Sequence, residues 1–252
     1  MTMIEIKHIT AGYGKKQILN DLDLCLEKGR LTSIIGANGC GKSTLFKAII
    51  GTVPHTAGEI TVDGIRIDTI SHKARARRIA CLAQINATPD MTVEQLVLCG
   101  RYPYLQYPRG YSTRDRAAAQ TAMERLNITA LAHRRLSSLS GGMRQNVYIA
   151  MALAQETDYL LLDEPTTYLD AAHKLSMMQM LRGLADSGIG VAAVMHDLPL
   201  ALSCADTVAV MDGGQIVLHD TPASLYAADC IPRIFGVRIG AVDGTYYCKL
   251  AP

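Results

Sequence analysis

The sequence predicts an α/β fold in which a mostly parallel sheet carries an N-terminal antiparallel β subdomain and an inserted helical subdomain. Three observations lead to this prediction. Residues before about 80 mostly alternate between apolar and polar side chains, three near-continuous apolar runs are typical of strands covered on both faces, and a helical block from about 86 to 156 separates the first of these runs from the other two. A chain of 252 residues is long enough for one large domain that contains such an insertion.

The N-terminal part predicts antiparallel strands. Ile4 and Ile6 alternate with charged neighbours, and leucines alternate with other residues over 22–27. Asp63-Gly64 stands between alternating apolar residues, which is a strong hairpin signal.

The covered strands lie at 31–35 (LTSII), 158–165 (DYLLLDEP) and 188–197 (GIGVAAVMHD). A helix rich in apolar residues follows the first strand at 43–53, and the helical segment 171–186 separates the other two. A second hairpin is expected at 206–220, around Asp212-Gly213-Gly214.

The helical block carries turn signals at Pro89, Pro103, Pro108 and Gly110. One of its helices should begin at Ser112 or Thr113, with the acidic Asp115 in the first turn. We therefore divide the single domain into a core with its β subdomain (1–85 and 157–225), a helical subdomain (86–156) and a short C-terminal extension (226–252).

Composition excludes several classes of protein. The net charge of +2 gives no case for a nucleic-acid partner, and the basic run at 72–78 is more typical of a solvated helix face than of a phosphate site. The seven cysteines are scattered without metal-ligand spacing, which favours reduced thiols in the cytosol. The charged N-terminus does not suit a signal peptide, and no apolar run reaches the roughly 18 residues of a membrane span.

Residues 36–44 (GANGCGKST) match the phosphate-binding loop pattern, with a predicted strand before it and a helix after it. Glycines at 36, 39 and 41 let the backbone approach phosphate oxygens, Lys42 supplies a charge to the β- and γ-phosphates, and the Ser43 hydroxyl suits Mg²⁺. The predicted core is therefore that of a P-loop NTPase.

Several polar residues follow the covered strands, where α/β sheets bind ligands. Asp163 suits Mg²⁺, and the next residue, Glu164, would point the other way along a strand and could act as a general base. His196 and Gln84 have the same placement, although Gln84 could simply cap a turn. Tyr13 lies between two glycines, so its ring could stack on a base or line a turn.

Residues 134–156 raise a separate question. Ser140-Gly141-Gly142 ends a polar turn before an amphipathic helix, and a helix N-terminus with glycines favours an anion, but no lysine accompanies it. The residues alone leave open an ordinary helix cap with Ser140 as the N-cap.

In the order P-loop, Gln84, LSGGM, LLLDEP, TTYLD and His196, the chain resembles the ATP-binding subunits of ABC transporters over nearly its whole length. The resemblance implies ATP and Mg²⁺ as cofactors. It implies that Tyr13 stacks on adenine, and that Gln84 senses Mg²⁺ and the attacking water. By the same resemblance Glu164 is the catalytic base, His196 contacts the γ-phosphate, and Asp170 communicates between paired subunits. The loop residues Asn38, Cys40 and Thr44 complete the nucleotide site with Gly36, Gly39, Gly41, Lys42 and Ser43.

The resemblance also implies partners. Two copies would pair head to tail so that Ser140, Gly141 and Gly142 close over the ATP of the other copy. The stretch from Gln84 to about Arg109 would dock on an integral-membrane permease, at the cytoplasmic face of the membrane, and a substrate-binding protein would act indirectly. Met143 stands where the family usually has Gln, which leaves the rate of hydrolysis open.

Residues 91–105 and 160–174, together with Met151, are similar to ATPase subunits of importers for iron-siderophores, haem and cobalamin. Another importer, an exporter, and a non-transport ABC regulatory protein are the alternatives.

Overall fold

A computed structural model describes residues 2–84, 88–107, 110–167, 169–226, 228–242 and 245–250. The N-terminal sheet is antiparallel and has the strand order β2-β1-β4-β5. Its strands are β1 (Met3–Tyr13), β2 (Lys16–Glu27), β4 (His55–Val62) and β5 (Ile65–Arg66). The turn between β4 and β5 places Asp63 at φ 51° and Gly64 at φ 77°, the left-handed pair that a two-residue hairpin turn requires. The predicted hairpin is therefore confirmed.

The central sheet has six strands in the order β10-β9-β3-β8-β7-β6. Neighbouring strands from β9 to β6 are parallel, and β10 pairs antiparallel with β9 at the edge. The strands are β3 (Leu31–Gly36), β6 (Ile79–Leu82), β7 (Tyr159–Asp163), β8 (Gly190–Val194), β9 (Thr207–Asp212) and β10 (Gln215–Asp220). The expected mostly parallel sheet and the second hairpin are both confirmed.

Side chains of the central sheet alternate between two hydrophobic cores. Leu161 packs into the core shared with the N-terminal sheet and α1 (Lys42–Ile49), whereas its neighbours Leu160 and Leu162 pack into the core shared with the later helices. Because every second residue faces the opposite core, both faces need apolar side chains. This explains why the strand sequences are near-continuously apolar.

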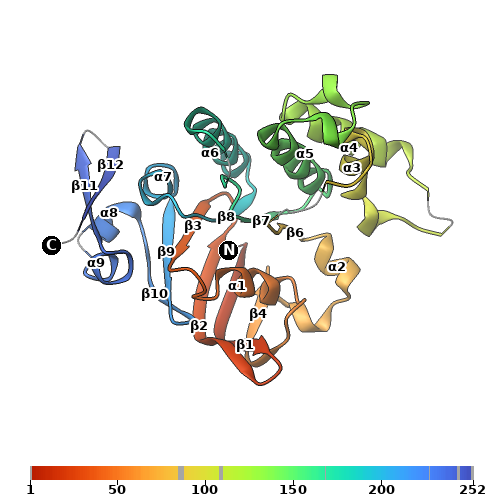
Figure 1. Cartoon of the computed structure of the whole chain (residues 1–252). Helices are drawn as coiled ribbons and strands as arrows, with labels where there is room; N and C mark the ends of the chain where they lie inside the picture. Colours follow the sequence, from red (N-terminus) through yellow and green to blue (C-terminus); the bar gives the residue numbers. More distant parts are fainter. Residues whose placement is uncertain are drawn as a thin grey trace.

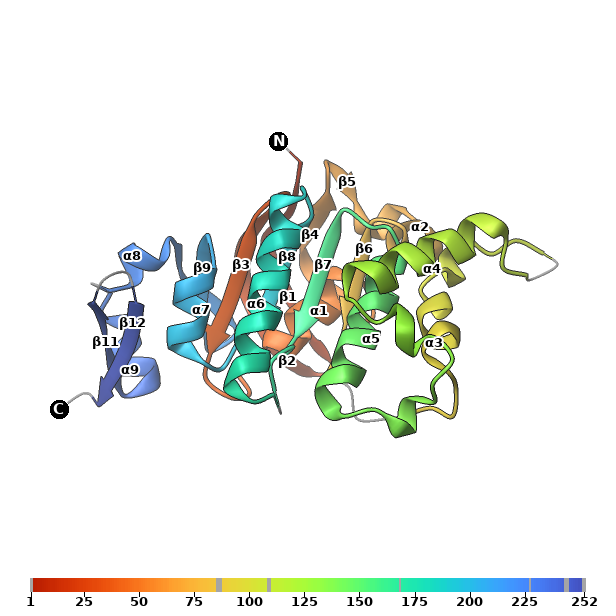
Figure 2. The same ribbon diagram turned by 90° about the horizontal axis from the view of Figure 1, so that it is seen from above.

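The face of the central sheet opposite the N-terminal sheet is covered by helices, and further helices extend beyond the β6 edge (Figures 1 and 2). Two of them lie over the sheet, α6 (Ala171–Asp186) and α7 (Leu198–Cys204). The inserted helical subdomain is formed by α3 (Val93–Cys99), α4 (Thr113–Arg125) and α5 (Gly141–Ala154). Short 3₁₀ turns at Ile67–Thr69, Tyr102–Tyr104, Thr129–Leu131 and Leu136–Ser138 complete the connections.

Helix α4 begins where the sequence predicts. Ser112 is the N-cap, and Ser112 and Asp115 form a reciprocal capping box. The Asp115 carboxylate also accepts a hydrogen bond from Arg101 Nε at 3.0 Å, and Arg101 itself is only 1% exposed. A second carboxylate, Glu156, accepts from the same guanidinium at 2.7 Å. This buried cation ties α4 to the end of α5.

The basic run at 72–78 departs from the expected solvated face. It forms the short helix α2 (His72–Ala76), in which Arg75 is buried and donates to the carbonyls of Ile50 and Ile67 at 2.8 and 2.5 Å. Arg75 therefore joins α2 to the end of α1, while its neighbours on the helix remain exposed or half-buried.

The C-terminal extension carries more structure than its sequence suggests. Helix α8 (Pro222–Tyr226) leads into it, and the extension contains α9 (Cys230–Phe235) and the hairpin β11 (Val237–Val242) with β12 (Thr245–Leu250). Leu225, Ile231 and Ile239 are buried in the core beside the central sheet. Within the described ranges, no helix combines the length and the apolar character that a membrane crossing requires.

Candidate nucleotide-binding site

The phosphate-binding loop connects β3, which ends at Gly36, to α1, which begins at Lys42. Gly41 has φ 112°, and a Cβ there would lie 2.9 Å from the Met211 side chain, so the turn requires glycine. Lys42 is 6% exposed, and its ammonium donates to the carbonyl oxygens of Gly36 and Ala37 at 2.9 Å each. The loop is thus wrapped around a buried positive charge at the carboxyl edge of the sheet.

The remaining loop residues fall into two groups. Asn38, Gly39 and Ser43 are exposed, whereas Cys40 and Thr44 are buried at 9% and 8% exposure. Burial raises the pKa of the Cys40 thiol, and the nearby charge of Lys42 opposes this shift without cancelling it.

Asp163 is the last residue of β7 and faces the loop. The Ser43 hydroxyl acts to lower the pKa of its carboxyl group, and the buried Oδ1 atom has no hydrogen-bond partner among the described residues. Burial raises the pKa of Asp163 because the charged form is removed from water. A buried carboxylate oxygen without a donor, beside a hydroxyl group, is a donor set that suits a hard divalent cation.

Glu164 does not continue the strand alternation that the sequence predicts. Its φ of 56° lies in the left-handed region, so the chain turns sharply after Asp163. The carboxylate then accepts hydrogen bonds from Gln84 Nε2 at 3.3 Å and from Thr167 Oγ1 at 3.0 Å, and it lies 2.5 Å from His196 Nε2. The turn, not the strand, separates the two carboxylates.

Gln84 and His196 reach Glu164 because β6, β7 and β8 are adjacent and parallel. Gln84 follows the end of β6, and His196 follows the end of β8, so both lie at the edge where β7 delivers the carboxylates. Burial acts to raise the pKa of Glu164, but hydrogen bonds from His196 and Thr167 and the charge of Lys42 outweigh it, and the net shift is downward. The carboxylate is therefore ionised at neutral pH.

Tyr13 ends β1 and is 48% exposed, as its position between glycines suggests. The Lys47 ammonium lies 5.8 Å from the centre of its ring. An exposed ring beside a cation can take part in stacking.

The Ser140 segment is separate from the phosphate loop. Ser140 is the N-cap of α5, and its Oγ accepts a hydrogen bond from Met143 N at 3.3 Å. Among the described residues outside its own turn of helix, a Cβ on Gly141 would meet no heavy atom within 4 Å, and one on Gly142 would meet Leu169 and His173, not the loop. Within one chain the serine is thus a helix cap, and the space beside Gly141 is open.

Asp170 is the N-cap of α6 and is exposed. Its carboxylate accepts a hydrogen bond from His173 N at 2.9 Å and lies 2.8 Å from His173 Nδ1. Sequence reasoning missed both His173 and Thr167. For Thr167 the available signal was its position three residues after Glu164. Nothing in the sequence marked His173.

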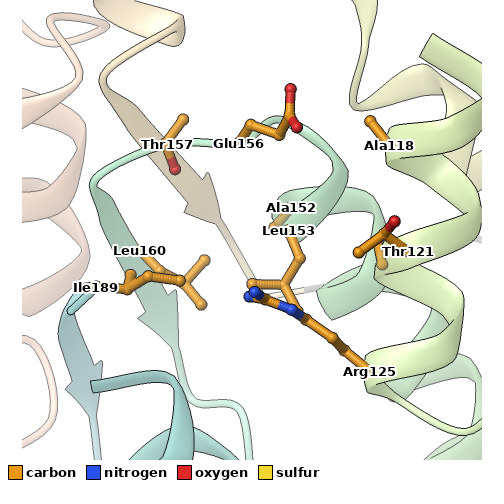
Figure 3. A pocket seen from close by; sticks show the side chains of 10 residues that line it. Ala118, Thr121, Arg125, Ala152, Leu153, Glu156, Thr157, Leu160 and Ile189 are labelled. Carbon is orange, nitrogen blue, oxygen red and sulfur yellow. The ribbon is translucent and has the colours of Figure 1, made fainter. Parts of the chain in front are cut away.

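A separate cavity of about 220 Å³ lies between the helical subdomain and the sheet (Figure 3). Arg125 and Thr121 reach it from α4, Leu153 from α5 and Leu160 from β7. It contains none of the residues around Glu164 or Lys42, so its location is distinct from the predicted chemistry.

The fold and this edge of the sheet together define an α/β P-loop nucleotide-binding protein with an inserted helical subdomain. Comparison with protein-family models matches the ABC transporter family over residues 19–167. The chain is 40% identical over 239 residues to the ferric enterobactin transport ATP-binding protein FepC of Escherichia coli (strain K12), covering 94% of this chain and 88% of that one. It is 38% identical over 219 residues to the iron(3+)-hydroxamate import ATP-binding protein FhuC of Bacillus subtilis (strain 168), covering 86% and 81%.

A solved ABC transporter of proposed metal-chelate type, in an inward-facing conformation, matches with a TM-score of 0.84 at 25% identity over 100% of this chain and 98% of that one. The chain belongs to the ABC transporter family, as an ATP-binding protein that energises transport. The predicted family and fold class are confirmed.

Proposed function

We propose that the chain binds Mg²⁺-ATP in the loop from Gly36 to Thr44 and hydrolyses it with Glu164 as the general base. The observation that carries this proposal is the convergence of Gln84, Thr167 and His196 on one ionised carboxylate beside the buried Lys42. A general base must be ionised and positioned before it can accept the proton of an attacking water. Here the hydrogen bonds to Glu164 keep its carboxylate ionised and hold it in position.

Ser43 and Asp163 would hold Mg²⁺, with Gln84 near enough to the same edge to assist. The support is the buried Asp163 Oδ1 atom, for which the described part of the chain supplies no hydrogen-bond donor. Bound there, the cation would neutralise negative charge on the β- and γ-phosphates. Lys42 would exchange its bonds to the Gly36 and Ala37 carbonyls for bonds to phosphate oxygens, and Tyr13 would stack on adenine.

Two copies would share each nucleotide. The first-turn N–H groups of α5 and the Ser140 hydroxyl of one copy would contact the γ-phosphate held by Lys42 of the other. The open space beside Gly141 supports this arrangement, because a phosphate can approach the backbone there. His196 and Asp170 would then respond to the γ-phosphate and to the second copy.

The Glu164→Gln variant tests this function. It should bind ATP, lose hydrolysis by about a hundredfold or more because the proton acceptor is gone, and double its mass by light scattering when ATP and Mg²⁺ are added. Glu124→Gln, an exposed carboxylate on α4, is the matched control and should hydrolyse ATP normally. Full hydrolysis by Glu164→Gln would refute Glu164 as the base.

The groove between α2 and the turn at Tyr102–Tyr104 would receive the permease at the cytoplasmic face of the membrane. It is a cavity of about 450 Å³, and Lys73, Ala76, Pro103 and Leu105 are among the residues that line it. Tyr102, Pro103 and Leu105 of this groove belong to the expected docking stretch between Gln84 and Arg109, whereas its α2 residues come before that stretch. Residues 85–87 and 108–109 of the stretch lie outside the described residues.

Cysteine crosslinking tests the docking surface. In a chain with the exposed Cys99 replaced by Ser, Lys73→Cys should crosslink to cytoplasmic loops of the co-expressed permease, and the exposed Ser224→Cys on α8 should not. Equal crosslinking from both positions would place the permease elsewhere.

The cargo would be an iron(III) chelate of the siderophore type, delivered by a substrate-binding protein. The names of the relatives support this, since one is described for ferric enterobactin and the other for iron(3+)-hydroxamate. Cells without this chain should lose uptake of radiolabelled iron supplied as such a chelate, and Glu164→Gln should not restore it. Normal uptake would point to another cargo.

A further inference from the structure

In the first turn of α6, the backbone and the side chain of His173 both bind the Asp170 carboxylate. Asp170 accepts a hydrogen bond from the backbone N–H of His173, and its two carboxylate oxygens lie 2.9 and 2.8 Å from the His173 ring Nδ1. The backbone bond is the ordinary cap of a helix, available to any residue at that position. The ring bond is specific to this side chain.

The other edge of the same ring faces the start of α5. A Cβ built on Gly142 would lie 3.6 Å from His173 Cδ2 and 3.3 Å from Leu169 Cδ2, so both side chains are in contact range of this glycine. His173 therefore lies between the Asp170 carboxylate and the backbone of the Ser140-Gly141-Gly142 segment.

A cavity of about 210 Å³ lies beside this contact, and Gly142, Leu169 and His173 form part of its wall. The rest of the wall comes from Asn146 on α5, from Ser176, Met177 and Met180 on α6, and from residues 125–127 at the end of α4. Figures 1 and 2 show the two helices side by side. The contact through His173 and Leu169 therefore borders a cavity at the boundary between the helical subdomain and the core.

We propose that His173 is a positioning residue that keeps Asp170 and the Gly142 backbone in a fixed relative position within each chain. The inference rests on the proposed function, in which both segments contact the second copy. Because the His173 ring is hydrogen-bonded to Asp170 and contacts Gly142, both segments would already be positioned when they contact the second copy. Without the ring, each segment would have to be ordered separately when two copies close over ATP, and that ordering opposes association.

Three substitutions at His173 separate its two contacts, each made in the Glu164→Gln chain. His173→Ala removes both contacts, and His173→Leu keeps apolar contact with Gly142 but loses the bond to Asp170. His173→Asn keeps a donor on Cγ at the place of Nδ1. Ala and Leu should weaken the ATP-driven association by about three- to tenfold, as expected for losing a hydrogen bond to a charged group, and Asn should restore most of it. His133→Ala is the control, because that histidine is 92% exposed on its side chain and lies in the helical subdomain.

Two further measurements distinguish positioning from a general loss of structure. The Kd of each separate chain for ATP and the Tm should stay close to those of the parent, because neither Lys42 nor the cores are altered. The proposal is overturned if Ala and Leu associate like the parent, or if all three variants lose association in proportion to a lowered Tm. If the Glu164→Gln parent itself does not associate with ATP, the proposed function fails, and this proposal fails with it.

Discussion

Gly141→Ala tests whether the glycine beside Ser140 is required by the fold or by a partner. Gly141 is the first residue of α5, is outside the left-handed region, and offers open space around a new Cβ. Alanine should therefore fit the separate chain. By restricting the unfolded chain it should raise the free energy of unfolding by about 0.5 kcal/mol, which corresponds to about 1–2 °C in Tm for a protein of this size.

Association should change in the opposite direction. A methyl group on Gly141 would occupy the space through which the partner's phosphate would approach the first-turn N–H groups of α5. The methyl group and the phosphate would then be closer than van der Waals distance, and the two copies would be held apart. We expect the ATP-driven association of Gly141→Ala, in the Glu164→Gln chain, to weaken by about tenfold or more.

Light scattering with increasing ATP measures the association, and scanning calorimetry measures the Tm. Gly142→Ala is the comparison, because its Cβ would lie 3.3 Å from Leu169 and should lower the Tm as well. Unchanged association of Gly141→Ala would refute the assignment of this segment to a partner's phosphate. A Tm lowered by several degrees would show that the fold itself requires the glycine.

Three further predictions follow from the buried charges and the loop thiol. Arg101→Met should lower the free energy of unfolding in urea by about 3 kcal/mol, because Asp115 loses its buried partner while Glu156 stays half-exposed, and a change below about 1 kcal/mol would contradict the buried pair. Burial acts to raise the pKa of Asp115, but hydrogen bonds from Ser112 and Arg101 outweigh it and the net shift is downward. The carboxylate therefore stabilises the fold above the unfolded pKa of about 3.9, and this stabilisation is lost as pH falls through the folded pKa. In an acid titration, Asp115→Asn should lose free energy of unfolding less steeply than the parent. The buried Cys40 should react with iodoacetamide more slowly than the exposed Cys99, and ATP should slow only Cys40, as measured by mass spectrometry of the labelled peptides; equal slowing of both thiols would contradict the loop assignment.

Local patterns predicted the parts of this molecule that local patterns control. Alternation and turn residues located the hairpin at Asp63-Gly64, and capping residues located the start of α4 at Ser112. The same Asp-Gly signal occurs at 243–244, outside the described residues, between β11 and β12. That hairpin could have been predicted by the rule already applied to the first one.

Contacts between distant parts of the chain could not be predicted in this way. Arg101 is one charge in a helical pattern, and its buried guanidinium donates to the Ala154 carbonyl and to the half-exposed Glu156, which are 53 and 55 residues away. The group around Glu164 depends on Gln84, 80 residues away, and on a left-handed turn that no periodicity marks. Position after a covered strand pointed to Glu164 and His196, whereas Gln84 could equally have capped a turn until the resemblance to a family gave it a role.

The two glycine-rich segments show how fold and function requirements can be told apart. At Gly41 the chain itself excludes other residues, since φ is 112° and Met211 and Leu19 surround the missing Cβ. At Gly141 no contact among the described residues requires glycine, because the backbone is helical and the space is open. A residue type that costs helix stability without serving the fold needs a reason outside the chain, and the phosphate that we propose a second copy holds would supply one. Gly142 lies between these cases, since it touches Leu169 and His173 in its own chain and follows directly on the open position. In the proposed dimer it would therefore be the point where the packing of one chain meets the contact between two, and His173 would be the side chain that joins them.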